Sequence, residues 1–206
     1  MKKKILLLGI ILASSVSLFA QTEVAKGDII IDPYVGVMQS NMLRSEPNDV
    51  NEISNWKLNG GQLAYGGRFE YMLADKFGLG IDFNYVKSGS KYDYIGTDGQ
   101  GNPATYTWDY TAKKIRAMVR MNYHFVQNET VDAYMGGGLG YKHTTRAWTI
   151  SDPNDQSGLE QEKALIPMAF RLAVGTRFYF TQNIGAMIEL GLGGGTPLQF
   201  GLSVKI

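Results

Sequence analysis

Hydrophobic and polar residues alternate one by one over eight stretches of this chain, a pattern typical of β-strands with two unlike faces. In FGLGIDFNY, for example, Phe77 and Leu79 fall on one face, whereas Asp82 and Asn84 fall on the other. The eight stretches begin near Ile29, Gln62, Phe77, Lys114, Val131, Phe170, Ile184 and Leu198. The pattern therefore predicts eight strands. The first contains Pro33, which has no N–H for a sheet hydrogen bond, so we expect a local bulge there.

The connections between these strands alternate in length. Short ones are predicted at 73–76, 127–130 and 181–183, and long polar loops at 39–60, 87–105 and 149–163, with a shorter loop at 193–197. An even strand number, with short turns on one rim and long loops on the other, is typical of outer-membrane barrels. The fold class predicted is all-β: one closed, antiparallel, up-and-down transmembrane barrel over residues 21–206.

All the charged residues in the predicted strands fall at the polar positions of the alternation, and therefore on one face of the sheet. They are Asp32, Arg68, Glu70, Asp82, Lys114, Arg116, Arg120, Asp132, Arg171, Arg177, Glu189 and Lys205. Glycines such as Gly66, Gly138 and Gly175 share this face, where they leave room for long side chains inside a narrow barrel. A lipid-facing Arg or Lys costs roughly 2–4 kcal/mol at mid-bilayer. We therefore place the polar face inside and the apolar face against lipid.

The interior of an eight-stranded barrel is only just wide enough to be filled by side chains. Because an unpaired buried charge is costly, we expect basic and acidic residues to pair there and plug the lumen. The predicted basic members are Arg68, Arg116, Arg120, Arg171 and Arg177, and the predicted acidic members are Glu70, Asp82, Asp132 and Glu189.

Aromatic residues gather near both ends of the predicted strands, as in the interfacial girdles of membrane barrels. Beside the short turns lie Tyr71, Phe77, Tyr123, Phe125, Phe178 and Phe180. Beside the long loops lie Tyr106, Trp108, Tyr110 and Trp148. We expect these two sets to mark the two membrane surfaces.

The N-terminus has the features of an export signal. Lys2, Lys3 and Lys4 precede an apolar stretch, 5–19, so residues 1–20 are interpreted as a signal peptide cleaved after Ala20. The chain has no cysteine, which excludes a lipid-modified cysteine, disulfides and cysteine-based catalysis or metal sites. The sequence contains no basic patch of the kind that nucleic-acid-binding proteins have, so nucleic-acid binding is not expected.

Taken together, the leader, the eight alternating stretches and segments such as GGRFEYMLADKFGLGIDFNY resemble the small outer-membrane barrel family (OmpA/OmpX-like). The resemblance covers nearly the whole predicted mature chain and implies a bacterial outer-membrane location and insertion by the outer-membrane assembly machinery. Two features depart from the family. The chain ends in Ile206 where an aromatic residue is common, and no peptidoglycan-binding domain follows the barrel.

Catalytic chemistry is not indicated. His124 and His143 are the only histidines; His124 is interpreted as a lumen residue, and no serine lies beside His143 in its strand to complete a triad. The acidic loop residues read as solvated turns rather than metal ligands, and no metal or cofactor is expected.

We expect a monomeric, non-enzymatic outer-membrane protein, in contact with lipid, that supports envelope integrity or uses its loops for adhesion or recognition. The loop aromatics Trp56, Tyr92 and Tyr94 are candidates for contact with an extracellular partner. Two alternatives remain open. One is a narrow porin or small-molecule conduit, and the other is a soluble, secreted, lipocalin-like barrel that binds an apolar ligand.

Overall fold

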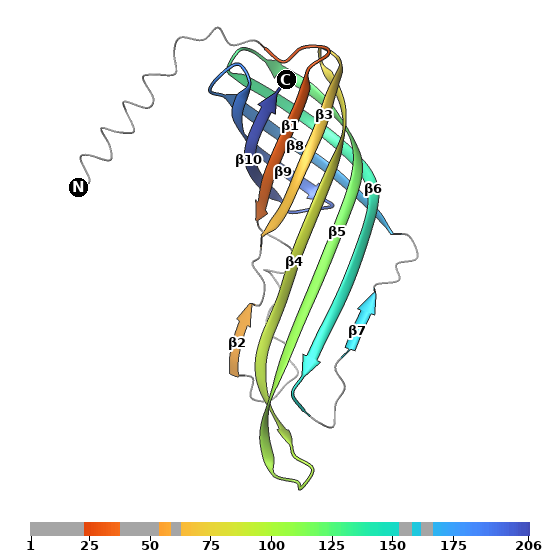
Figure 1. The fold of residues 1–206 in the computed structure, drawn as a ribbon, viewed down its shortest axis with the longest axis vertical. Coiled ribbons are helices and arrows are strands. Elements are labelled where there is room, and N and C mark those ends of the chain that lie inside the picture. The colour runs from red at the N-terminus through yellow and green to blue at the C-terminus, as the bar shows by residue number, and fades with distance from the viewer. Residues whose placement is uncertain (1–22, 38–53, 59–62, 153–157, 162–166) are drawn as a thin grey trace, which may run out of the picture.

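The computed structural model describes residues 23–37, 54–58, 63–152, 158–161 and 167–206, and the predicted signal peptide lies outside them. The described residues form ten strands (Figure 1): β1 (Ile29–Val37), β2 (Ser54–Leu58), β3 (Ala64–Ala74), β4 (Phe77–Thr97), β5 (Pro103–Gln127), β6 (Val131–Ile150), β7 (Gly158–Gln161), β8 (Met168–Tyr179), β9 (Ile184–Gly193) and β10 (Leu198–Lys205). Among these residues, no helix is long and apolar enough to cross a membrane.

Eight of these strands close into a ring. The order of neighbours is β4-β3-β1-β10-β9-β8-β6-β5, and β5 pairs back to β4. Every pair is antiparallel, including the seam between the first and last strands, where Ile31 lies opposite Val204. The predicted all-β, closed, antiparallel eight-stranded barrel is therefore confirmed.

Pro33 lies in β1 without the expected bulge. The register from Asp32↔Arg68 to Tyr34↔Gly66 is continuous on the β3 side. On the β10 side the pairing lapses at Asp32 and Pro33 and resumes in the same register at Tyr34↔Gly201. The prediction of a bulge was wrong, because a local gap in one ladder is enough to accommodate the missing N–H.

One rim of the barrel carries the short turns, at residues 75–76, 128–130 and 180–183, as predicted. The other rim differs from the prediction: residues 87–105 are not a loop. Strand β4 continues to Thr97 and β5 starts at Pro103, so only residues 98–102 turn. The polar residues of this segment had suggested a loop, but its β-branched and aromatic residues continue the alternation, and both strands stay paired to the tip.

The three longest strands, β4, β5 and β6, extend together beyond this rim (Figure 1). Strand β4 last pairs with β3 at Ala64↔Val86, yet it stays paired with β5 as far as Thr97. Residues 87–97 of β4, 103–113 of β5 and 145–150 of β6 form what we call the extension. At about 3.3 Å per residue it reaches roughly 35 Å beyond the barrel. Short β2 pairs with β4, and β7 pairs with β6. Both lie within segments predicted as loops, the rest of which falls partly outside the described residues.

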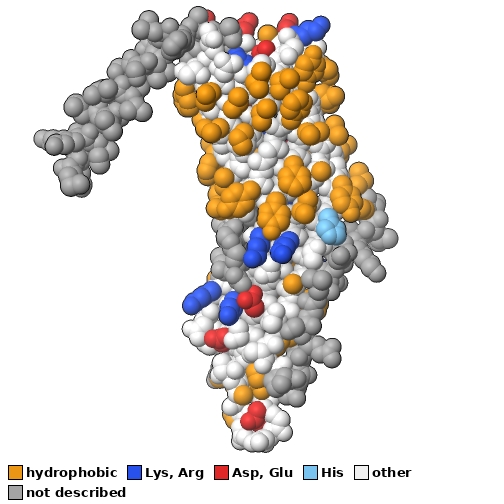
Figure 2. Space-filling model, viewed as in Figure 1, with side chains coloured by type: hydrophobic (Ala, Val, Ile, Leu, Met, Phe, Trp, Pro, Cys, Tyr) orange, Lys and Arg blue, Asp and Glu red, His pale blue; other side chains and the backbone are white. Residues whose placement is uncertain are grey.

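The barrel wall has two distinct faces. Along β8, β9 and residues 77–86 of β4, buried and exposed residues alternate, with the charged side chains buried and most of the large apolar ones exposed. Figure 2 shows the result on one side of the barrel as a broad hydrophobic band, and exposed apolar residues on the remaining barrel strands continue it; we call this surface the apolar belt. Leu139 and Leu172 in this belt are each 62% exposed. The apolar face therefore points outward, which contradicts the alternative of a soluble barrel with an apolar interior.

Candidate functional site

The middle of the lumen is built around the carboxylate of Glu189, on β9. Three guanidinium groups from three other strands reach it: Arg68 at 2.9 Å, Arg120 at 2.5 Å and Arg171 at 3.0 Å. Asp82 completes the group, accepting from Arg68 Nε at 3.0 Å. All five side chains are at most 3% exposed. This set, the Glu189 cluster, ties together strands β3, β4, β5, β8 and β9 across the barrel.

A second set lies on the side of the short turns and is centred on Arg177, on β8. Its guanidinium bonds Asp32 at 2.8 Å, Glu70 at 2.6 Å and Asp132 at 2.7 Å. The ring of His124 lies between two of these carboxylates, with Nδ1 2.6 Å from Asp132 and Nε2 3.1 Å from Glu70. We call this set the Arg177 cluster. It places His124 in the lumen, as the sequence had indicated.

Arg116 is the member of the predicted network that the structure leaves outside it. Its Nη1 donates to the amide oxygen of Asn84 at 3.0 Å. Among the described residues no carboxylate lies within ion-pair distance of it. The prediction that Arg116 bridges to a carboxylate was therefore wrong. Parity placed its side chain on the inner face, but it lies nearer the rim than Arg120 does, beyond the reach of Asp82 and Glu189.

Two lumen tyrosines were missed by the sequence reasoning. The Tyr34 hydroxyl donates to Asp82 at 2.6 Å, and the Tyr134 hydroxyl donates to Glu189 at 3.0 Å. Arg68 lies 4.7 Å from the Tyr34 ring centroid, and Arg177 lies 4.4 Å from that of Tyr134. These rings fill the space between the arginines and add cation–π contacts.

A signal for these tyrosines does exist in the sequence. Each ring lies over a glycine that is its cross-strand partner, Tyr34 over Gly66 and Tyr134 over Gly175. A Cβ added to Gly175 would come within 2.5 Å of the Tyr134 hydroxyl. A tyrosine and a glycine on the inner face of neighbouring strands therefore mark a ring lying flat across the sheet.

An exposed apolar belt of this extent, around an interior of buried charges, reverses the arrangement of a water-soluble protein and matches a surface that faces lipid. The chain is an eight-stranded transmembrane β-barrel of the outer-membrane type. In such barrels the short turns face the periplasm and the longer connections face outward. The extension therefore belongs to the outer side of this outer-membrane barrel.

Comparison with known proteins gave solved structures only. The N-terminal β-barrel domain of Pseudomonas aeruginosa OprF is 15% identical over 88% of this chain and 99% of its own, with a TM-score of 0.46. The attachment invasion locus protein Ail of Yersinia pestis is 13% identical over 88% and 99%, with a TM-score of 0.45. P. aeruginosa OprG is 16% identical over 91% and 99%, also with a TM-score of 0.45.

No protein-family model matches the sequence, and no curated protein is significantly similar to it. The TM-scores lie below 0.5, so the identification of the barrel rests on its own closed pairing and apolar belt.

The aromatic residues predicted to form the periplasmic girdle lie at or next to strand ends, beside the short turns. Phe77 and Tyr123 are cross-strand partners with ring centroids 5.1 Å apart. Five of the six are exposed to the surroundings and Tyr123 is half-buried; the set is Tyr71, Phe77, Tyr123, Phe125, Phe178 and Phe180. Amphipathic and aromatic rings at this level suit the headgroup region.

The outer girdle differs from the prediction. Trp108, Tyr110 and Trp148 lie on the extension, where Tyr110 pairs with Trp148. Trp108 is seven residues beyond Ile115 in β5, roughly 20 Å further out. Tyr106, the fourth residue predicted for this girdle, lies further out still, opposite Tyr94. The assignment of these four residues to a girdle was wrong, because it assumed that the strands stop at the rim. The outer edge of the belt instead carries Tyr65, Tyr85, Tyr141 and Phe170.

Aromatic pairs on one face stiffen the extension. Tyr92 and Trp108 are cross-strand partners whose rings stack at 6.4 Å and 14°, and the next such pair, Tyr94 and Tyr106, lies at 5.9 Å. Such pairs contribute roughly 0.5–1.5 kcal/mol beyond their buried area. The extension is thus a paired sheet with its own side-chain contacts, not a loose loop.

Asp98 closes the tip of the extension. Its Oδ1 accepts from the backbone amides of Asn102 and Gln100, each at 2.8 Å, and Gly101 in the same turn has a φ of 87°. These two donors, that of Asn102 first, hold the pKa of Asp98 below its usual value. The carboxylate therefore stabilises the turn at any pH above the ordinary aspartate pKa of about 3.9. This contribution is lost as the pH falls through the lowered value.

We expect an NMR titration of the Asp98 carboxyl group to show a lower midpoint in the folded barrel than in the urea-unfolded chain. The amide shifts of Gln100 and Asn102 should move with the same midpoint, because their partner is the group that titrates. A folded midpoint equal to or above the unfolded one would contradict this account of the turn.

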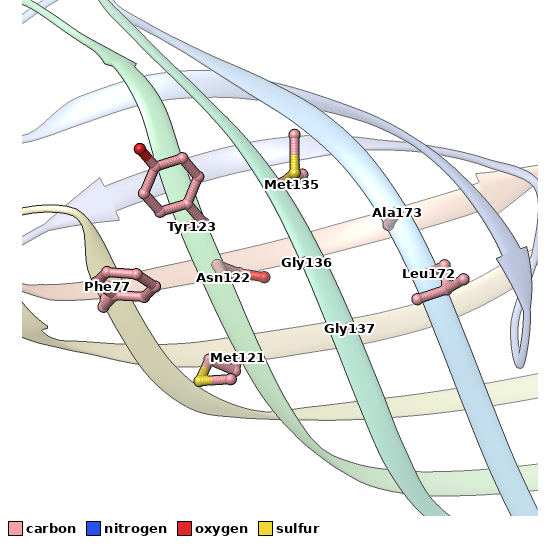
Figure 3. A pocket seen from close by; sticks show the side chains of 9 residues that line it. All are labelled: Phe77, Met121, Asn122, Tyr123, Met135, Gly136, Gly137, Leu172 and Ala173. Carbon is pink, nitrogen blue, oxygen red and sulfur yellow. The ribbon is translucent and has the colours of Figure 1, made fainter.

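A shallow hollow interrupts the apolar belt between β4, β5, β6 and β8 (Figure 3). It exists because Gly137 faces outward between Met121 and Leu172, so that no side chain fills the row. Asn122 at its floor bonds Glu70 and Arg120 within the lumen. The hollow is therefore part of the lipid-facing surface, with an apolar lining suited to an acyl chain.

Both histidines have side-chain partners in the part of the chain described. His124 is fully enclosed by the Arg177 cluster, and His143 Nε2 lies 3.3 Å from the Thr145 hydroxyl. Over the same residues, no group of histidine, aspartate and glutamate side chains has the arrangement of a metal site.

Proposed function

We propose that this outer-membrane barrel serves as a closed anchor that displays the extension at the cell surface for recognition or adhesion. The observation that carries the proposal is that β4, β5 and β6 stay paired beyond Ala64, the outermost residue of β3. A paired sheet holds its side chains in fixed positions far from the membrane. Functional contacts are commonly built on segments that a rigid scaffold positions in this way.

The absence of cysteine from the chain makes the display directly measurable. A membrane-impermeant maleimide should label Lys91→Cys, on the exposed face of the extension, in intact cells. It should label Glu129→Cys, in the exposed turn 128–130, only after the outer membrane has been permeabilised. The opposite pattern of labelling would overturn the proposed display.

Recognition is tested by trimming the extension. Ser90 and Tyr110 are cross-strand partners, so residues 91–109 can be replaced by a two-residue Asn-Gly turn, which suits a hairpin. The trimmed barrel should still fold, as judged by heat-modifiable gel migration. Cells that produce it should lose adhesion to laminin- or mucin-coated wells and to one another, relative to the full-length protein. Unchanged adhesion in all three assays would refute a recognition role.

A role in envelope integrity gives a different result in the same strains. Such a role needs only the barrel, so the trimmed protein would restore detergent resistance to a deletion strain as well as the full-length protein does. The recognition proposal expects adhesion and resistance to separate, with trimming affecting adhesion alone.

We also propose that the lumen does not conduct. The Glu189 and Arg177 clusters support this, since they lie at successive levels of the barrel and draw charged groups from opposite walls. In planar bilayers the purified barrel is expected to show no steady conductance, whereas a porin recorded in parallel gives open channels. Sustained ion conductance through the wild-type protein would favour the narrow-conduit alternative.

A further inference from the structure

Side chains become strongly basic where β4, β5 and β6 leave the apolar belt. Segments 84–88, 112–116 and 142–146 lie side by side, since Asn84 pairs with Arg116 and Arg116 with Lys142. They contain no acidic residue and six basic ones: Lys87, Lys113, Lys114, Arg116, Lys142 and Arg146. We call these three segments the basic collar. Figure 2 shows basic side chains directly beyond the edge of the belt.

Two lysines of the basic collar stand out because they oppose each other. Lys87 and Lys113 are direct cross-strand partners, and both are exposed. Opposed side chains have Cβ atoms roughly 5 Å apart, and like charges placed so destabilise a sheet. Within the described residues neither ammonium group has a carboxylate at ion-pair distance. The pair therefore concentrates positive charge that the described protein does not compensate.

The side chains of Lys87 and Lys113 point outward, next to the outer edge of the apolar belt. Residue parity puts Lys87 and Lys113 on the same face as Tyr85 and Ile115, which form the outermost apolar row of the belt on these strands. One step of two residues along the strand is about 7 Å. The two ammonium groups thus lie just outside the hydrocarbon, at the depth of lipid headgroups, whereas lumen residues such as Arg116 point inward.

We propose that Lys87 and Lys113 bind the phosphate groups of outer-leaflet lipids, whose acyl chains lie along the belt beneath. Phosphate is the anionic group that membrane lipids hold at this depth, and lysine binds it as a point charge. A phosphate between the two ammonium groups would convert their mutual repulsion into two attractive contacts. The exposed ring of Tyr141, on the neighbouring strand, gives the same lipid an amphipathic contact at the edge of the belt.

The extension offers a matched control. Lys57 and Lys91 are also exposed cross-strand partners, and Lys91 lies on the same face as Lys87. They stand four residues further out, roughly 13 Å, and Lys91 has Asp109 opposite it in β5. The double variants Lys87→Gln/Lys113→Gln and Lys57→Gln/Lys91→Gln remove the same charge from the same exposed surface.

The probe is lipid A carrying two phosphates, added to the detergent-solubilised, folded barrel and counted as bound adducts by native mass spectrometry. A basic side chain near an anionic surface contributes roughly fivefold to affinity, so loss of Lys87 and Lys113 is expected to weaken binding about 30-fold. The Lys57/Lys91 variant should bind as the wild type does. Heat-modifiable migration verifies that both variants are folded.

Three results would overturn the assignment. Equal weakening in both variants would indicate non-specific charge attraction, and unchanged binding in both would exclude the pair. Displacement of lipid A by inorganic phosphate at equal concentration would indicate a site for the free anion rather than for a lipid headgroup. Wild-type binding to phosphatidylcholine alone should be weak, because its headgroup has no net charge.

Discussion

Replacing Glu189 by alanine is expected to lower the free energy of unfolding of the barrel by about 3–5 kcal/mol. This carboxylate accepts from Arg68, Arg120 and Arg171 and from the Tyr134 hydroxyl. Its removal leaves three buried guanidinium groups with Asp82 as the nearest remaining carboxylate of the cluster. Urea unfolding in phospholipid vesicles, followed by tryptophan fluorescence, measures the loss.

The control for this prediction is Glu129→Ala. Glu129 lies exposed in the turn 128–130, so its replacement is expected to change stability by less than about 0.5 kcal/mol. Glu189→Gln keeps the shape and removes the charge, and it should fall between the two. If Glu189→Ala and Glu129→Ala gave the same small loss, the Glu189 cluster would not hold the barrel together.

Placing an arginine at Val119 is expected to destabilise the inserted barrel by about 2–4 kcal/mol, the cost of a charged side chain at the bilayer midplane. Val119 is 60% exposed in the middle of the belt, between its cross-strand partners Ile81 and Leu139. Thr111→Arg, on the same face of the same strand but beyond the basic collar, should have almost no effect. Reversible urea unfolding in vesicles compares the two variants.

This pair of variants tests the orientation of the whole barrel wall. If both arginines cost the same, or if Val119→Arg were neutral, the belt would not contact hydrocarbon. The membrane placement of the basic collar would then fail as well. A large loss of stability for Val119→Arg alone would mean that position 119 lies in the hydrocarbon and position 111 lies outside it.

The two faces of the wall were predictable from sequence because the strand period is two residues. Once Leu79 and Ile81 are assigned outward, Asp82 must point inward whatever the register of the neighbouring strands. The closed eight-stranded barrel follows from the number of such stretches and the short turns between them. These are local properties, and the structure confirms the fold they predict.

The partners within the lumen were not predictable in the same way. Arg68 meets Glu189 across the barrel, although 121 residues separate them in the chain. Which charges face each other depends on the stagger between strands, which no local pattern encodes. That is why parity alone assigned Arg116 to a carboxylate, whereas the structure gives it Asn84.

The extension was missed because its composition predicts a loop, whereas the alternation of its residues predicts paired strands. Lysine, glycine, serine and aspartate between Lys87 and Thr105 suggest a loop. The alternation through Tyr92 and Tyr94, matched by Tyr106 and Trp108 on the next strand, suggests a hairpin. Cross-strand aromatic pairing decides in favour of the hairpin, and only the register reveals it.

The seam between β1 and β10 has a consequence for biogenesis. Ile29 and Ile206 exchange two backbone hydrogen bonds, each 2.9 Å long. The strands that join here are the first and the last of the barrel to be synthesised. An intermediate that still lacks β10 cannot close the cylinder, and any open intermediate in lipid would leave two strand edges unsatisfied. The cylinder can therefore close only once β10 is available to pair with β1, so insertion into lipid has to bring the two ends of the barrel sequence together.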